Sequence, residues 1–190
     1  MVGVFDIIPD DTAFSLELDS EAASGDAEAW SAQLQRCVLD YEEDDVIRGP
    51  VVASASLYRV HFGSGDWYED LDEESHTAEV VGAAFRKRHE FEDEDLVGLF
   101  SSALVVIDDI EVPEKWRGAK LSHGLIRAIT SVFRSDHIGL LPSQMSEGPD
   151  GQFRLDLAKE SALRRHWEGV GFRLIPGSSV MWLPFEGRAL

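Results

Sequence analysis

The stretch SALVVIDDIEVPEKWRGAKLSHGLI, residues 102–126, carries the strongest local signal in the sequence. Its apolar run, within residues 103–112, predicts a central strand that is covered on both faces. Pro113 marks a turn, and residues 119–134 then carry apolar side chains at helical spacing. The N-terminus of a helix binds anions, because its first N–H groups have no partner within the helix and its dipole is positive there. We therefore predict an anion site at residues 117–122.

The composition is that of an acidic globular protein. Its 190 residues are 44% hydrophobic, which is enough for a core, and their number suits one domain over residues 1–190. The formal net charge is −19, from 36 acidic and 17 basic residues. This charge argues against binding to nucleic acid or to an anionic membrane surface, whereas it is compatible with a cationic ligand.

The sequence also predicts a cytoplasmic protein. Cys37 is the single cysteine, so the chain has no intrachain disulfide, which is typical of a reducing compartment. The first residues lack the basic segment and the apolar run of a secretory signal. No stretch approaches the roughly 18 apolar residues that a membrane-spanning helix needs.

Hydrophobic periodicity divides the remaining chain into further strands and helices. In residues 1–100 it predicts a strand at 13–18, a helix at 25–40, a turn at 49–50, a strand at 51–62 and a helix with an acidic first turn at 67–89. In residues 101–190 it predicts a strand at 137–142, a loop at 143–153, a helix at 155–169 and a hairpin at 172–183. The strand, helix and strand across residues 103–142 predict a parallel crossover, so the fold class is α/β with a mixed sheet.

Two short motifs carry a resemblance to a known superfamily. Before the helix stand Pro113, Trp116 and the pair Arg117-Gly118, and near the C-terminus three residues separate Trp167 from Gly171-Phe172. With the order of strands and helices around them, residues 100–184 resemble the GNAT superfamily of acyl-CoA N-acyltransferases. The resemblance implies a mixed, mostly antiparallel central sheet with a parallel, splayed strand pair, flanked by helices. Residues 1–100 match the superfamily only in the broad order of their elements.

The resemblance implies an acetyl-CoA-dependent N-acyltransferase that moves an acyl group directly to an amine in a ternary complex. The loop N–H groups would hold the pyrophosphate, and the end of the central strand would pair with the pantetheine. The residues implied in binding the acyl donor are Ile110, Val112, Arg117, Gly118, Ala119, Lys120, Leu121 and Ser122. The acceptor would be an amine of a small molecule or of a protein, and the acidic surface favours a cationic one. The sequence leaves open whether the chain forms a homodimer.

Three positions depart from the superfamily's pattern. Lys120 stands where a glycine is usual, and Ser122 stands where glycine or alanine is usual. Trp167 stands where many members have a tyrosine that protonates the departing thiolate, and an indole N–H can only donate a hydrogen bond. These departures favour an alternative hypothesis, in which the chain binds CoA or a protein partner without catalysis. A third hypothesis is an interaction domain whose acidic runs at residues 40–45 and 66–74 bind a basic partner.

The candidate catalytic groups are two carboxylates, the indole of Trp167 and the neighbouring imidazole of His166. Asp109 and Glu111 share a face of the central strand and are candidate general bases, although a β-bulge would change this alternation. The alternative interpretation is that they are surface residues or pair with nearby cations. Trp167 and His166 are the candidates on the thiolate side, with His166 expected on a different face of the helix.

The remaining histidines and the acidic runs do not predict a metal site. His123 and His137 are expected to be structural or exposed. The sequence has no CxxC, no HExxH and no close histidine pair, and neither of the acidic runs at residues 66–74 and 90–95 has the spacing of a calcium loop.

Overall fold

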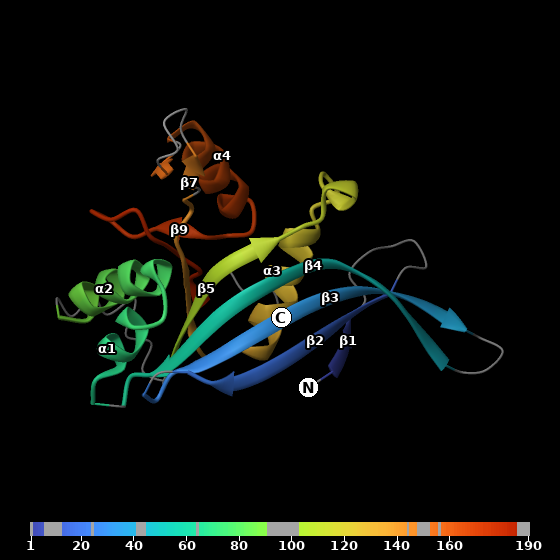
Figure 1. Ribbon diagram of the computed structural model, residues 1–190, viewed down its shortest axis with the longest axis horizontal. Coiled ribbons are helices and arrows are strands. Elements are labelled where there is room, and N and C mark those ends of the chain that lie inside the picture. The colour runs from blue at the N-terminus through green and yellow to red at the C-terminus, as the bar shows by residue number, and fades with distance from the viewer. Residues whose placement is uncertain are drawn as a thin grey trace.

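The computed structural model describes residues 2–5, 13–23, 25–40, 45–63, 65–90, 103–143, 145–147, 153–155 and 157–185. Its strands are β1 (Val2–Phe5), β2 (Ala13–Ala22), β3 (Glu28–Asp40), β4 (Asp45–His61), β5 (Ala103–Glu111), β6 (His137–Leu140), β7 (Met145–Glu147), β8 (Phe153–Leu155), β9 (Arg173–Leu174) and β10 (Met181–Trp182). Its helices are α1 (Trp67–Asp72), α2 (His76–Glu90), α3 (Leu121–Val132) and α4 (Leu157–Glu168), with a 3₁₀ turn at Glu114–Trp116. The fold is therefore α/β, as predicted (Figure 1).

One mixed sheet of eight strands organises the described residues, in the order β1-β2-β3-β4-β5-β6-β10-β9 (Figure 1). Every neighbouring pair in this sheet is antiparallel except β5 and β6, which run parallel from Leu104 opposite His137 to Ile107 opposite Leu140. Helix α3 connects these two strands, so the predicted parallel crossover is confirmed. The prediction of a mostly antiparallel sheet with one parallel pair is confirmed with it.

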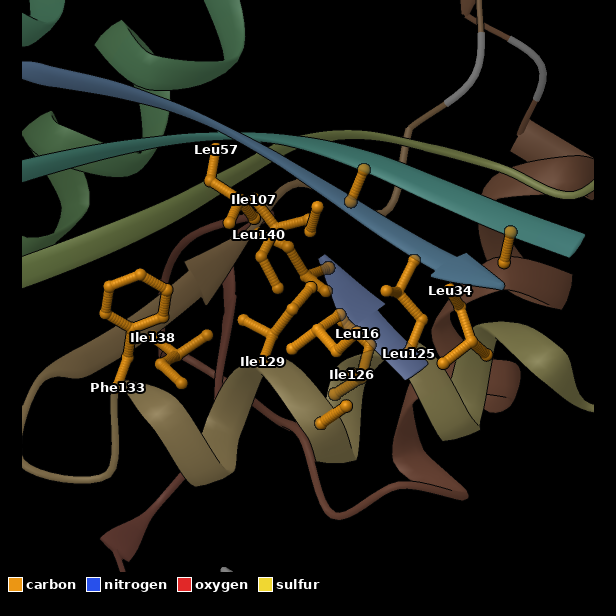
Figure 2. Close-up of a cluster of buried hydrophobic side chains, with 14 of the residues drawn as sticks. Leu16, Leu34, Leu57, Ile107, Leu125, Ile126, Ile129, Phe133, Ile138 and Leu140 are labelled. Carbon is orange, nitrogen blue, oxygen red and sulfur yellow. The ribbon is translucent and has the colours of Figure 1, made fainter. Parts of the chain in front are cut away.

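The two faces of the sheet are covered by different helices. Helix α3 packs on one face and contributes Leu125, Ile129 and Phe133 to a large apolar core, in which they point toward the strands (Figure 2). On the other face α1 and α2 contribute Leu71 and residues of the first three turns of α2 to a second core. Because β5 lies between both cores, its residues 103–107 are all buried, which explains why its sequence is apolar at consecutive positions. None of the helices in the described ranges is long and apolar enough to cross a membrane.

The predicted helix at residues 25–40 is wrong, because residues 28–40 form strand β3. Trp30, Ala32 and Leu34 alternate toward the α3-side core, as a strand requires. Register shifts between Leu34 and Cys37 then move the next buried residue to Cys37, three positions on. A strand with such an irregularity mixes spacings of two and three residues, which produced a false helical period.

Other boundaries differ for local reasons. Gly49-Pro50 is not a turn but lies within β4, opposite the register shift in β3. A Cβ at Gly49 would lie 2.7 Å from the carbonyl oxygen of Arg36, so close backbone approach explains this glycine. The predicted helix at 67–89 is divided into α1 and α2, and the hydroxyl of Ser75 accepts the N–H of Ala78 at the start of α2 (3.0 Å). The predicted loop at 143–153 contains β7.

A half-buried ion pair fastens the α3 crossover to the antiparallel strands. Arg59 on β4 donates from Nε to Asp136, which precedes β6, at 2.9 Å, and from Nη1 to Glu28 on β3 at 3.2 Å. The Asp136 side chain is only 7% exposed, so Arg59 compensates a carboxylate that has little contact with water. The guanidinium also lies 5.9 Å from the ring centre of Phe133 at the end of α3. The pair thereby fixes where β6 begins beside β5.

We predict that Asp136→Ala lowers the free energy of unfolding by about 3 kcal/mol, because it leaves a partly buried guanidinium without its main partner. Urea denaturation analysed by linear extrapolation measures this change. Glu79→Ala, which removes an exposed carboxylate paired with His76, is the control and should change the value by less than about 0.5 kcal/mol. Equal effects of the two substitutions would contradict the assignment.

Candidate functional site

A cleft opens where β5 and β6 part. The two strands are paired over only four residues of β5, 104–107, and β6 ends at Leu140, whereas β5 continues to Glu111 beside β4 alone. A cavity of about 180 Å³ fills the gap and is lined by both strand ends and by Leu163 and Trp167 of α4. The side of β5 that β6 has left therefore offers an edge of backbone groups beside a cavity, the arrangement that binds extended ligands.

A second, larger groove of about 630 Å³ continues from this cleft to the start of α3. Asp109, Ile110, Leu163 and Trp167 line both parts, so the two are one continuous site. Of the eight predicted donor-binding residues, those that line the groove are Ile110, Val112, Arg117, Gly118, Lys120, Leu121 and Ser122. The four predicted catalytic residues, Asp109, Glu111, His166 and Trp167, line it as well. Ala119 does not, and lies on a neighbouring hollow beside α3.

The loop before α3 adopts a conformation that presents backbone N–H groups. Gly118 has φ +88°, and Lys120 has φ +55° and ψ +28°, the only positive φ of a non-glycine residue in the described part of the chain. The first hydrogen bonds of α3 run from the N–H groups of His123 and Gly124 to the carbonyl of Lys120. The N–H groups of Leu121 and Ser122 lie ahead of these bonds, at the positive end of the helix.

Lys120 therefore takes the left-handed conformation that glycine adopts without strain. The superfamily that the motifs resemble usually has a glycine at this position. The backbone here has the conformation that glycine favours, but the residue is a lysine. A lysine there costs about 1–2 kcal/mol of backbone strain. Its ammonium adds a positive charge at the groove, which glycine could not supply. Strain that persists beside a cavity is typical of a binding site.

A β-bulge in β5 sets the direction of the acidic side chains. Ser56 of β4 lies opposite Asp109 and Leu57 lies opposite Ile107, so Asp108 is the extra residue. Ile107 and Ile110 both pack toward the α3-side core despite their three-residue separation. Asp109 and Glu111 share a face, as predicted, but the bulge places it opposite that core, where both are exposed. Without the bulge, these two carboxylates would follow Val105 and Ile107 into the apolar core.

Asp108 has a structural partner of its own. Its carboxylate accepts a hydrogen bond from the Ser75 hydroxyl at 2.5 Å. Burial, followed by the charges of Asp108 and Glu74, raises the pKa of Tyr58 above its usual value. Because Asp108 is engaged by Ser75, whereas Asp109 lines both parts of the site, Asp109 is the better candidate for a general base.

His166 lines the groove together with Trp167. The two side chains were expected on different faces of the helix, but both reach the same groove. Its Nε2 is 2.8 Å from the hydroxyl oxygen of Ser122, and its ring centre is 4.2 Å from that of His123. Burial and then the charge of Lys120 lower the pKa of His166. Burial, His166, Lys120 and Arg127 lower the pKa of His123, although His123 also hydrogen-bonds the backbone of His166. Both imidazoles therefore favour the neutral form more strongly than an exposed histidine does.

The Ser122–His166 contact joins residues 44 positions apart and has no signature in the sequence. A second feature that sequence reasoning missed is the indole N–H of Trp116, which is buried and makes no hydrogen bond within the described structure. Trp116 lines the groove, although this nitrogen itself is buried beneath its surface.

The groove contains few groups that can transfer a proton near neutrality. Its described lining includes neither tyrosine nor cysteine. Trp167 is 7% exposed, and its indole can donate a hydrogen bond but cannot act as a general acid. His166 is the lining residue whose type titrates near neutral pH.

No cluster of three or more histidine, cysteine, aspartate or glutamate side chains in the described ranges is arranged to hold a metal ion.

No protein-family model matches the chain, and a search of curated proteins found no match. A functional conclusion therefore depends on the geometry and chemistry of the groove and on the resemblance of its motifs.

We predict that Lys120→Gly leaves the free energy of unfolding unchanged or raises it by about 0.5 kcal/mol. Relief of backbone strain, about 1–2 kcal/mol, exceeds the entropy that glycine adds to the unfolded chain. Ala119→Gly, one position earlier and without a positive φ, is the matched control and should lower the value by about 0.4–1 kcal/mol. Urea denaturation distinguishes them, and a larger loss for Lys120→Gly would contradict a strained loop.

The lowered pKa values of His123 and His166 predict a stability that falls in acid. Because the folded protein binds these protons less tightly than the unfolded chain, this contribution is complete above the ordinary histidine pKa of about 6.5 and is lost as the pH falls below it. Thermal unfolding between pH 7.5 and 5 should show a smaller decrease in Tm for the double variant H123Q/H166Q than for the wild type. Identical pH profiles would contradict the direction of both shifts.

Proposed function

We propose that this protein is an acetyl-CoA-dependent N-acyltransferase that moves an acyl group directly to an amine. The observation that carries the proposal is the continuous groove, which runs from the gap between β5 and β6 to the N–H groups at the start of α3. Such a groove suits a long ligand that has an anionic end and an extended, amide-containing arm. The GNAT-like motifs in residues 100–184 support the same ligand.

The start of α3 is suited to the pyrophosphate. The N–H groups of Leu121 and Ser122, the positive end of the helix, and the cations Arg117 and Lys120 all favour a dianion. Arg117 is held near the groove by donating from Nε to the carbonyl of Val112 at 3.2 Å. A Cβ built on Gly118 would meet no atom within 4 Å, so the loop leaves open space for a ligand at that point.

The parted strand is suited to the pantetheine arm. Residues 109–111 of β5 pair with β4 on one side and have lost β6 on the other. An arm that contains two amides can bond to such an edge as an additional strand would. The apolar side chains of Ile110 and Leu163 give the arm a surface on which to lie. Its end would then reach the smaller cavity between the strands.

The proposed catalysis consists mainly of positioning the amine against the bound acyl donor. The bound donor supplies an acyl group activated as a thioester, and the protein's own contribution is to hold an amine against it. Positioning of this kind contributes up to about 7–11 kcal/mol to the barrier reduction. Asp109 and Glu111 are the candidates for the base that removes a proton from the amine, since both line the groove and are exposed. Their charges also favour an amine that arrives as a cation.

A second candidate function is CoA binding without catalysis. The observation that favours it is Trp167, which stands in the groove where the resemblance expects a proton donor and which cannot serve as one. Both functions require the same binding, and they differ in whether the thiol is released.

We predict that acetyl-CoA stabilises the protein against heat. A ligand at about 100 times its Kd adds about 2.7 kcal/mol, which raises Tm by about 5–10 °C for a chain of this length. Arg117→Met should weaken binding about fivefold, because one solvent-screened charge contact is worth about 1 kcal/mol. Arg134→Met, beyond the opposite end of α3, is the matched control and should bind as the wild type does.

No stabilisation at millimolar acetyl-CoA would overturn both candidate functions, because a ligand bound only by the native state must stabilise it. Where binding is observed, release of thiol from acetyl-CoA in the presence of a panel of amines separates the two. Amine-dependent thiol release supports the transferase, and binding without release for every amine supports the non-catalytic candidate.

A further inference from the structure

His166 occupies a place in the groove that the proposed transfer chemistry does not use. Its ring is held by Ser122, whose hydroxyl oxygen is 2.8 Å from Nε2, and by the ring of Trp167, whose centre lies 4.6 Å away. Ser122 is in the first turn of α3 and is only 8% exposed. The imidazole is thus fixed beside the helix start, at the end of the groove that suits the pyrophosphate.

The charges that surround His166 come from three elements. The cationic and titratable groups are Lys120 and Arg117 of the loop and His123 of α3, and the acidic ones that line the same groove are Asp109 and Glu111 of β5. Without a ligand, burial and then the charge of Lys120 lower the pKa of the imidazole, because a proton there is poorly solvated and places a second cation beside the ammonium. An anion bound between Lys120 and His166 reverses this effect on the pKa, because it attracts both the ammonium and the imidazolium.

We propose that His166 acts through the Ser122 hydroxyl in binding the diphosphate of the acyl donor, and that the groove takes up a proton at His166 when the diphosphate binds. The inference rests on the proposed function, because it concerns the anionic part of the same ligand. It adds a residue on α4 to a site that otherwise consists of the α3 loop.

The hydrogen bonds of the two states differ in direction. In the neutral imidazole with its proton on Nδ1, Nε2 accepts the hydroxyl proton of Ser122. Addition of one proton from solvent to Nε2 gives an imidazolium whose Nε2–H is a donor. This N–H then donates to the Ser122 hydroxyl oxygen, and the hydroxyl turns to donate its own proton to a phosphate oxygen. One proton is gained, no covalent bond of the ligand changes, and two charge-assisted hydrogen bonds form.

Because ligand binding and proton binding are linked, the proposed proton uptake can be measured as a pH dependence of affinity. If binding takes up a fraction of a proton, the association constant rises as the pH falls, by at most about tenfold per pH unit for one group. Lower pH should therefore strengthen binding of the donor while it weakens the stability of the unliganded protein. A ligand without the diphosphate should show neither proton uptake nor this pH dependence.

Calorimetric titration with dephospho-CoA is the decisive experiment. This ligand keeps the diphosphate but lacks the phosphate monoester, which would itself titrate near pH 6. Titrations at pH 6.5 in buffers of different ionisation enthalpy should report net proton uptake, and affinity should rise about threefold or more from pH 8 to pH 6. Acetyl-pantetheine, which lacks the diphosphate, should bind without uptake.

Variants assign the proton to its residue. H166Q should bind dephospho-CoA more weakly at pH 6, with no proton uptake and a flat pH profile, because glutamine can hydrogen-bond but not titrate here. H123Q should keep most of the uptake, since His123 lines the neighbouring hollow and not the groove. H76Q, at a side chain that is 80% exposed on α2, is the matched control and should behave as the wild type does.

Each outcome bears on the inference separately from the proposed function. Binding of dephospho-CoA with no proton uptake overturns the role of His166 and leaves the CoA site standing. Uptake that survives in H166Q also overturns it, and assigns the proton to another group. No binding of dephospho-CoA or acetyl-CoA overturns the proposed function and this inference together.

Discussion

The groove depends on one constraint, the brevity of the parallel pairing between β5 and β6. Four residues of β5 are enough to anchor β6 in the sheet, because the crossover through α3 is packed on the apolar core and fastened by Arg59 and Asp136. Beyond Ile107 no ladder holds the strands together, so they part. The space between the two strands and the start of α3 are consequences of the same connection, since the chain passes from the end of β5 through one loop into α3.

Two opposing demands meet at the start of α3. The loop must turn sharply enough to present the first N–H groups of the helix, which requires a left-handed residue, and an anion also favours positive charge nearby. Glycine satisfies the first demand and lysine the second. At Lys120 this chain accepts backbone strain and gains a cation, and His166 and Ser122 lie close enough to extend the same polar cluster.

The described part of residues 101–190 followed the sequence prediction except at β7 and β8, because the other elements there have a regular period and a distinct end. The apolar run of β5, the amphipathic α3 and the turn at Pro176-Gly177 between β9 and β10 are examples. The prediction failed in β3, where register shifts near Gln35 break the alternation. In the site, the motifs predicted which residues gather in the groove. They could not predict the contact of Ser122 with His166, since only tertiary packing brings the two together, nor the unpartnered indole of Trp116.

The extra residue in β5 has an implication for how this site can change. Asp108 stands outside the alternation, so the positions that face the α3-side core before and after it, Ile107 and Ile110, keep their packing whatever side chain position 108 carries. Position 108 also lines the cleft. The bulge therefore separates the opening from the packing of the α3-side core. A lineage of such proteins could alter what enters the cleft by substitution at one residue, with the loss of the hydrogen bond to Ser75 at the start of α2 but with that core intact.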